Sequence, residues 1–146
     1  MYEVPSKFTG LKSEPVDINE FKSLCYSLQG LGVLTVESIK AHEYPNNYYE
    51  AIVSSENEKF SLFINMYISV IGLGNRTENE EKYINKPSIF SAVEELNGNY
   101  TVLTKEILSA NATIENLKKL SAVEKHEVKE WLPSTMGGLL FTWFFD

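Results

Sequence analysis

The sequence predicts an α+β fold: one domain over residues 1–146, with an antiparallel sheet and helices packed mainly on one face of it. Three observations lead to this prediction. A helix-start pattern opens an amphipathic segment near residue 17, apolar and polar residues alternate between residues 49 and 66, and residues 131–146 are the most apolar and aromatic part of the chain. Such alternation is typical of strands with one packed and one wetter face.

The first predicted helix covers about residues 17–29. Asp17 stands immediately before the apolar pattern and Glu20 follows three residues later, which is the spacing of a capping box. Gly30 suits the left-handed position that ends many helices. The apolar side of this helix repeats at helical spacing and consists of Ile18, Phe21, Leu24, Cys25 and Leu28.

The centre of the chain predicts strands. Residues 31–41 are rich in Val, Ile and Thr, and their apolar face switches near Glu37, where a β-bulge would explain the change. Two alternating runs follow, at residues 49–53 and 60–66. The turn residues between them predict a β-hairpin with a loop of four or five residues.

A glycine-containing segment comes next. Gly72–Thr77 carries two of the three glycines of a dinucleotide-binding loop, but no βαβ pattern surrounds it, so it is predicted to be an ordinary loop. The polar segment from Thr77 to Lys86 carries Glu78, Glu80 and Glu81. It is predicted to continue as an exposed loop.

The second half of the chain predicts three further helical segments and one strand. The helices are expected near residues 88–96 with Ser88 as the N-cap, over residues 112–131 with a break, and over residues 134–145. The strand is expected within residues 99–107.

The last of these helices is expected to close the core. Pro133 prevents a helix from running through from upstream, and Ser134 or Thr135 can cap a new one. Gly137 and Gly138 would fall in its first turn. Because glycine is unfavourable inside a helix, something is expected to pack closely on the backbone there. A binding role for the aromatic residues is the alternative.

Charge and composition bound the possible partners. The formal net charge of −7 disfavours nucleic acid and anionic membranes as partners and favours basic proteins, although solubility alone also explains it. The chain has no apolar segment of about 20 residues and no signal-peptide pattern at its start. We therefore expect a cytoplasmic protein that does not enter a membrane.

The residues that could carry catalysis are few. His42 and His126 are the two histidines, and neither has a second His or Cys at metal-ligand spacing, so no metal or cofactor is predicted. Cys25, the single cysteine, lies on the apolar side of the first helix and is expected in the core. The sequence predicts no enzyme, with a nucleophilic Cys25 beside a histidine as the alternative.

One family resemblance comes from the C-terminal stretch. The pattern Trp131-x-Pro133-x-Thr135-x-Gly137, followed by Phe141 and an aromatic-rich finish at Asp146, resembles the C-terminal signature of small bacterial immunity proteins. These proteins act against toxins of contact-dependent growth inhibition and related polymorphic toxin systems. The resemblance implies a non-enzymatic, stoichiometric inhibitor that binds a cognate toxin domain.

The acidic charge agrees with a basic nuclease as the toxin. An inhibitor of such an enzyme would place carboxylates where nucleic-acid phosphate otherwise binds, and the candidate partner-binding residues are Glu78, Glu80, Glu81, Glu94 and Glu95. An equal alternative is the C-terminal acidic group Glu124, Glu127 and Glu130. Two rival functions stay open: an interaction or accessory domain without a toxin, and a small enzyme that uses Cys25 or a histidine.

Overall fold

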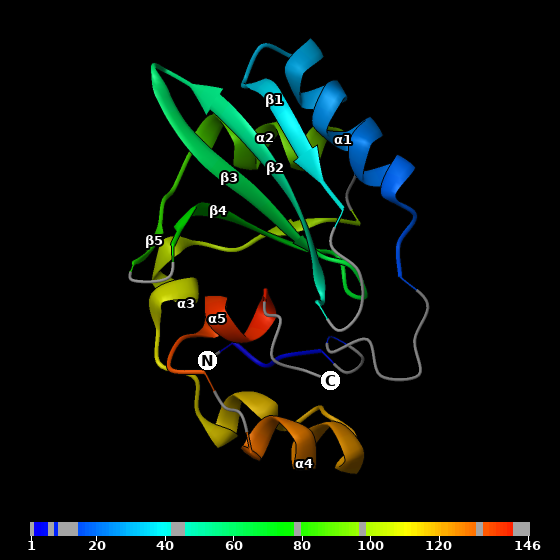
Figure 1. Cartoon of the computed structure of the whole chain (residues 1–146), viewed down its shortest axis with the longest axis vertical. Coiled ribbons are helices and arrows are strands. Elements are labelled where there is room, and N and C mark those ends of the chain that lie inside the picture. The colour runs from blue at the N-terminus through cyan, green and yellow to red at the C-terminus, as the bar shows by residue number, and fades with distance from the viewer. Residues whose placement is uncertain are drawn as a thin grey trace.

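The chain forms a six-stranded sheet with helices on both faces (Figure 1). The α+β class is as predicted. The computed structural model describes residues 2–5, 8, 15–41, 46–77, 80–96, 99–130 and 133–141. Its elements are α1 (Ile18–Gly30), β1 (Thr35–Lys40), β2 (Tyr48–Ser55), β3 (Glu58–Asn65), β4 (Val70–Arg76), β5 (Glu81–Tyr83), α2 (Pro87–Leu96), β6 (Thr101–Val102), α3 (Lys105–Ser109), the 3-10 helix η1 (Ile114–Leu117), α4 (Ala122–Glu130) and α5 (Met136–Leu140).

The strand order is β1-β2-β3-β4-β5, and each of these neighbours is antiparallel. β6 lies off this path and runs parallel to β4, pairing Thr101 with Val70 and Val102 with Ile71. β5 pairs with the other end of β4, from Gly74 onward. The β4 strand therefore has β3 along one side and both β5 and β6 along the other.

The β1–β2–β3 meander confirms one prediction and corrects another. The register between β1 and β2 shifts between Val36 and Ser38, which places the predicted bulge at Glu37. The predicted hairpin loop of four or five residues is wrong, because the ladder continues to the pair Ser55 and Glu58. Only Glu56 and Asn57 form the loop, with φ of 53° and 63°. Two positive φ values fit a type I′ turn, whose twist matches that of the flanking strands.

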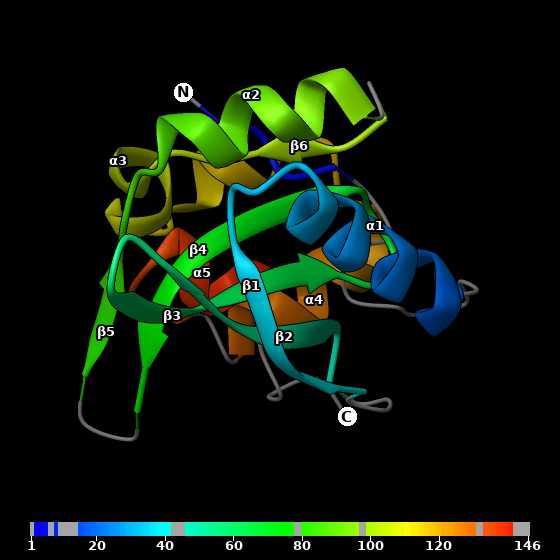
Figure 2. The same cartoon turned by 90° about the horizontal axis from the view of Figure 1, so that it is seen from above.

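Helices cover both faces of the sheet, so the prediction that they pack mainly on one face is wrong. Neighbouring residues of β3 show the reason, because both of its faces are buried. Leu62 and Ile64 pack with residues of α1 and α2, whereas Phe63 packs with residues of α3, α4 and α5. In Figure 2, α4 and α5 accordingly lie behind the sheet, away from α1 and α2.

The predicted loop at residues 72–77 is instead β4, whose glycines allow close packing. A Cβ atom on Gly72 would lie 2.7 Å from Cε2 of Phe141, and one on Gly74 would overlap the carbonyl oxygen of Lys82 in β5. These glycines are therefore explained by close approach within a strand and not by a flexible turn. The neighbouring prediction of an exposed loop at residues 77–86 is also wrong in part, because β5 occupies its middle and Tyr83 is buried.

The first helix has the predicted N-cap, but its cap bond goes to Asn19 and not to Glu20 as in a capping box, and the helix ends differently. The Asn19 N–H donates to the Asp17 carboxylate over 2.8 Å, so Asp17 is the N-cap of α1. At the other end, Gly30 is the last helical residue and Leu31 keeps a right-handed conformation. The left-handed glycine is Gly32, with a φ of 77°.

Two later elements also differ in their boundaries. α2 begins at Pro87, which fits the first helical position because no N–H is needed there, so Ser88 lies inside the helix and is not its N-cap. The strand expected within residues 99–107 is only Thr101–Val102. Thr104 then caps α3, with the Ile107 N–H donating to its hydroxyl over 3.3 Å.

The C-terminal helix is confirmed in position but is shorter than predicted in the part that the structure describes. Thr135 caps α5, which ends at Leu140, and residues 142–146 lie outside the described residues. Leu139, Leu140 and Phe141 are fully buried in the second core. The break expected within residues 112–131 separates η1 from α4.

Candidate functional site

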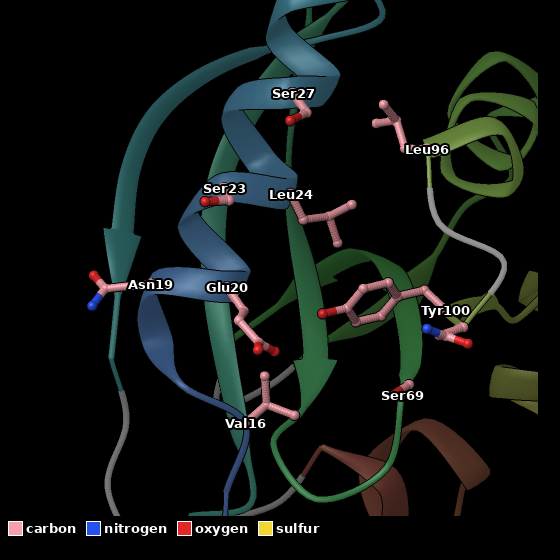
Figure 3. A pocket seen from close by; sticks show the side chains of 10 residues that line it. Val16, Asn19, Glu20, Ser23, Leu24, Ser27, Ser69, Leu96 and Tyr100 are labelled. Atoms are coloured by element: carbon pink, nitrogen blue, oxygen red, sulfur yellow. The ribbon is translucent and has the colours of Figure 1, made fainter.

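An open groove of about 580 Å³ runs between α1 and the chain that leads from α2 into β6 (Figure 3). One wall is α1, which contributes Asn19, Glu20, Ser23, Leu24 and Ser27. The opposite wall contains Leu96 and Tyr100, and Ser69 lies at one end. The groove mixes apolar side chains with polar groups.

The spacing of α1 places its polar residues along this groove. Glu20, Ser23 and Ser27 stand at positions i, i+3 and i+7, so they share one side of the helix. That side lies directly beside the apolar stripe, whose residues Phe21 and Leu28 are fully buried against the sheet. The helix therefore carries a polar row at the margin of the core, facing the opposite wall.

Tyr100 reaches across the groove toward α1 (Figure 3). Its side chain is only 9% exposed, and its hydroxyl finds no hydrogen-bond partner among the described residues. Burial raises the pKa of Tyr100, and the nearby Glu20 and Cys25 raise it further. The hydroxyl therefore stays protonated near neutral pH, and it can both donate and accept a hydrogen bond in the groove.

The charge of the groove is acidic. Glu20 is the one charged side chain among the described residues that line it. A second, smaller hollow of about 190 Å³ also borders Tyr100 and is lined in part by Glu94. Tyr100 thus borders two hollows, each lined by one carboxylate, Glu20 from α1 and Glu94 from α2.

The predicted partner-binding residues do not form one surface. Glu94 and Glu95 are exposed on α2, on the face of the sheet that carries the first core. Glu81 is exposed on β5, where its carboxylate accepts hydrogen bonds from Tyr83 and Thr135 at the other face. Of the remaining two residues, Glu80 is exposed beside β5, and Glu78 lies outside the described residues.

The alternative acidic group loses one of its members as a partner-binding residue, because the fold buries Glu124. Glu124 is buried, with 3% exposure, and its N–H donates to the Ser121 hydroxyl at the start of α4. It is therefore a packed residue of the helix start and does not offer a carboxylate to a partner. The side chains of Glu127 and Glu130 fall outside the described part of the chain.

The residues considered for catalysis do not form a site among the described residues. Cys25 is fully buried in the first core, and burial raises the pKa of its thiol to about 12. A thiol with so high a pKa holds almost no thiolate at neutral pH, so Cys25 is a core residue and not a nucleophile. His126 is exposed on α4, His42 lies outside the described residues, and the described part of the chain holds no group of three acidic, histidine or cysteine side chains that could bind a metal.

The described residues of the C-terminal signature hold α5 on the sheet. The Thr135 hydroxyl accepts from the Gly138 N–H over 3.0 Å and donates to the Glu81 carboxylate over 2.7 Å. The Gly137 backbone packs so closely on the Tyr83 ring that an added Cβ would overlap it. These contacts confirm the expected close packing on the glycines of this helix.

Phe141 completes the attachment of α5. Its ring stacks on Phe63 of β3, with centroids 5.6 Å apart and an angle of 27° between the planes. Its carbonyl oxygen accepts a hydrogen bond from Arg76, whose guanidinium also lies 4.7 Å from the Phe63 ring centroid. The signature residues that can be placed are thus explained by packing and capping.

Comparisons of the chain with models of protein families, with curated proteins and with solved structures each return no match. Within the part of the chain that the structure describes, no helix has the length and apolar character needed to span a bilayer. The function is therefore inferred from the groove, the charge and the C-terminal resemblance.

Proposed function

We propose that this protein is an immunity protein, which binds a cognate bacterial toxin domain and neutralises it by forming a non-covalent one-to-one complex in the cytoplasm. The toxin is proposed to be a basic nuclease. The observation that carries the proposal is the open acidic groove beside α1, with Glu20 as its one charged side chain among the described lining residues. It is supported by the net charge of −7.

The acidic charge of the chain favours a basic protein as the target. A nuclease binds the phosphates of its substrate with Lys and Arg, so the face that it presents is positive. A surface with carboxylates and without cations complements that face, speeds the encounter and competes with phosphate. The groove and the second hollow, which both border Tyr100, supply two such carboxylates, Glu20 and Glu94.

The C-terminal signature is not the surface that we expect to contact the toxin. Gly137 and Phe141 are buried, and Thr135 is engaged at the start of α5, so these residues offer little to a partner. The resemblance therefore supports a shared scaffold, and the surface that meets the toxin is expected elsewhere. The groove meets the requirement because it is open and combines apolar and polar groups, as protein interfaces taken as a whole do.

Inhibition by binding also agrees better with the groove than catalysis does. The thiol that an enzyme would use, Cys25, belongs to the core and has a raised pKa. The groove offers hydroxyl, amide and carboxylate groups spread along a helix, which suit recognition of a surface. We therefore favour the inhibitor over an enzyme that uses Cys25.

The experiment first asks whether the reading frame immediately upstream ends in a toxin domain, which the proposal expects, and then uses that domain. The two proteins are co-expressed and purified, and the mass of the complex is measured by light scattering after size exclusion. We expect a one-to-one complex and loss of nuclease activity at equimolar inhibitor, with a toxin domain from an unrelated system left active. Absence of a complex would contradict the proposal. Inhibition at far less than equimolar protein would instead favour the enzyme.

A further inference from the structure

We propose that the groove beside α1 holds an arginine side chain of the partner, with its guanidinium between Glu20 and Tyr100. The inference rests on the proposed function for the identity of the partner protein. The chemistry of the occupant is argued from the groove itself, and it can be tested without the toxin.

Two polar groups, the Tyr100 hydroxyl and the Glu20 carboxylate, face the same space. The Tyr100 ring is nine-tenths buried, yet its hydroxyl has no hydrogen-bond partner among the described residues and points into the groove. The Glu20 carboxylate lies on the facing wall, and Figure 3 shows it directed toward the space in front of that hydroxyl. A donor that reaches both oxygens would satisfy the tyrosine and neutralise the carboxylate.

The groove around these two groups has both apolar and polar surface. Val16, Leu24 and Leu96 provide apolar surface beside the polar row of α1. An arginine matches this mixture, because its methylene stem covers apolar surface while its head carries five donors in a planar fork. The fork can pair with a carboxylate through two hydrogen bonds, and a remaining N–H can donate to the Tyr100 hydroxyl.

Acidic and purely apolar occupants fit the groove less well. A phosphorylated or acidic segment would bring negative charge next to Glu20, with no cation among the described lining residues to offset it. A purely apolar side chain would remove water from the Glu20 carboxylate and the Tyr100 hydroxyl without replacing their hydrogen bonds, which is unfavourable. A cationic donor meets neither objection. Arginine is favoured over lysine because lysine lacks the planar fork.

The test is an NMR titration of the full chain, labelled with nitrogen-15, with an acetylated and amidated Gly-Gly-Arg-Gly-Gly peptide. A second peptide carries citrulline, which has nearly the shape of arginine without its charge, and a third carries lysine. We expect the arginine peptide to shift the amide signals of Ser23, Ser27 and Ser69, with weak affinity, and the citrulline peptide to shift them far less. The lysine peptide is expected to bind several-fold more weakly than the arginine peptide.

Three variants locate the interaction. Glu20→Gln should weaken binding of the arginine peptide about tenfold, because a charge-assisted hydrogen bond is replaced by a neutral one. Tyr100→Phe should weaken it about threefold and leave the melting temperature unchanged, since the hydroxyl has no partner among the described residues to lose. Glu115→Gln, which removes the same charge from exposed η1 on the other face of the sheet, should bind like the wild type.

The outcomes separate this inference from the proposed function. Equal shifts with arginine and citrulline, or equal affinity of the wild type and Glu20→Gln, would overturn the arginine site even if the toxin complex forms. Equal affinity for the lysine peptide would overturn the assignment to arginine. Localised arginine binding without any toxin complex would keep the site and reject the immunity function.

Discussion

Replacing Gly74 by alanine is expected to lower the free energy of unfolding by about 3 kcal/mol, because the new methyl group has no space. A Cβ atom on Gly74 would overlap the Lys82 carbonyl oxygen and lie 2.9 Å from the Tyr83 Cα. Both atoms belong to the backbone of β5, which cannot move aside as a flexible side chain could. The measurement is urea unfolding followed by circular dichroism.

Gly30→Ala is the matched control, because it makes the same chemical change in open space. No atom lies within 4 Å of a Cβ at Gly30, and its position at the end of α1 is helical. Alanine should therefore raise the free energy of unfolding by about 0.5–1 kcal/mol. If the two variants unfold at the same urea concentration, β5 is not packed on Gly74 as described.

Truncating Phe141 to alanine is expected to lower the free energy of unfolding by about 3–5 kcal/mol. The ring is fully buried, stacks on Phe63 and fills the space that Gly72 leaves open. Since whole domains are stable by only about 5–15 kcal/mol, the variant should be marginally folded. Thermal unfolding and yield of soluble protein measure the effect.

Val123→Ala provides the comparison for this change. Val123 is 53% exposed on α4, so its truncation should alter stability by about 0.5 kcal/mol or less. A Phe141→Ala protein as stable as this control would show that the C-terminal segment is not docked on the sheet. In that case a binding role for the aromatic residues would become the better interpretation.

Local patterns predicted the elements that depend on local physics. The cap and apolar stripe of α1 and the bulge at Glu37 each follow from a few neighbouring residues, and the structure has both. The prediction of a loop at Gly72–Thr77 was wrong because the role of its glycines depends on residues outside the segment. Gly72 is needed by Phe141, which is far along the chain, and two glycines in sequence are equally typical of a loop.

The arrangement of helices on the sheet was a second non-local failure. The sequence did contain one indication of a second core. Phe63 is a large apolar residue on the face of β3 opposite Leu62 and Ile64. β6 could not be predicted as a parallel partner of β4, since a two-residue strand carries no periodic pattern. Both features depend on which segments meet in space.

The groove was missed for a related reason. Glu20 was explained as part of a helix cap, which hid its place in a polar row with Ser23 and Ser27. That row was visible in the sequence as polar residues at helical spacing beside an apolar stripe. The opposite wall could not be predicted from the sequence, because Tyr100 comes to lie beside α1 only in the folded chain. Density of charge along the chain therefore pointed to Glu80 and Glu81 instead.

The most direct test of an acidic groove that meets a basic toxin is the association rate measured against ionic strength by stopped-flow fluorescence. The comparison is between the wild type, the double variant Glu20→Gln/Glu94→Gln, and the matched double variant Glu80→Gln/Glu115→Gln, which removes the same charge elsewhere. Glu81 is left intact because its carboxylate binds Thr135 and Tyr83. We predict that the groove variant associates more slowly with a flatter salt dependence, while the matched variant follows the wild type. Identical slopes for the two double variants, or a wild-type rate that does not change with salt, would contradict the proposed role of the groove.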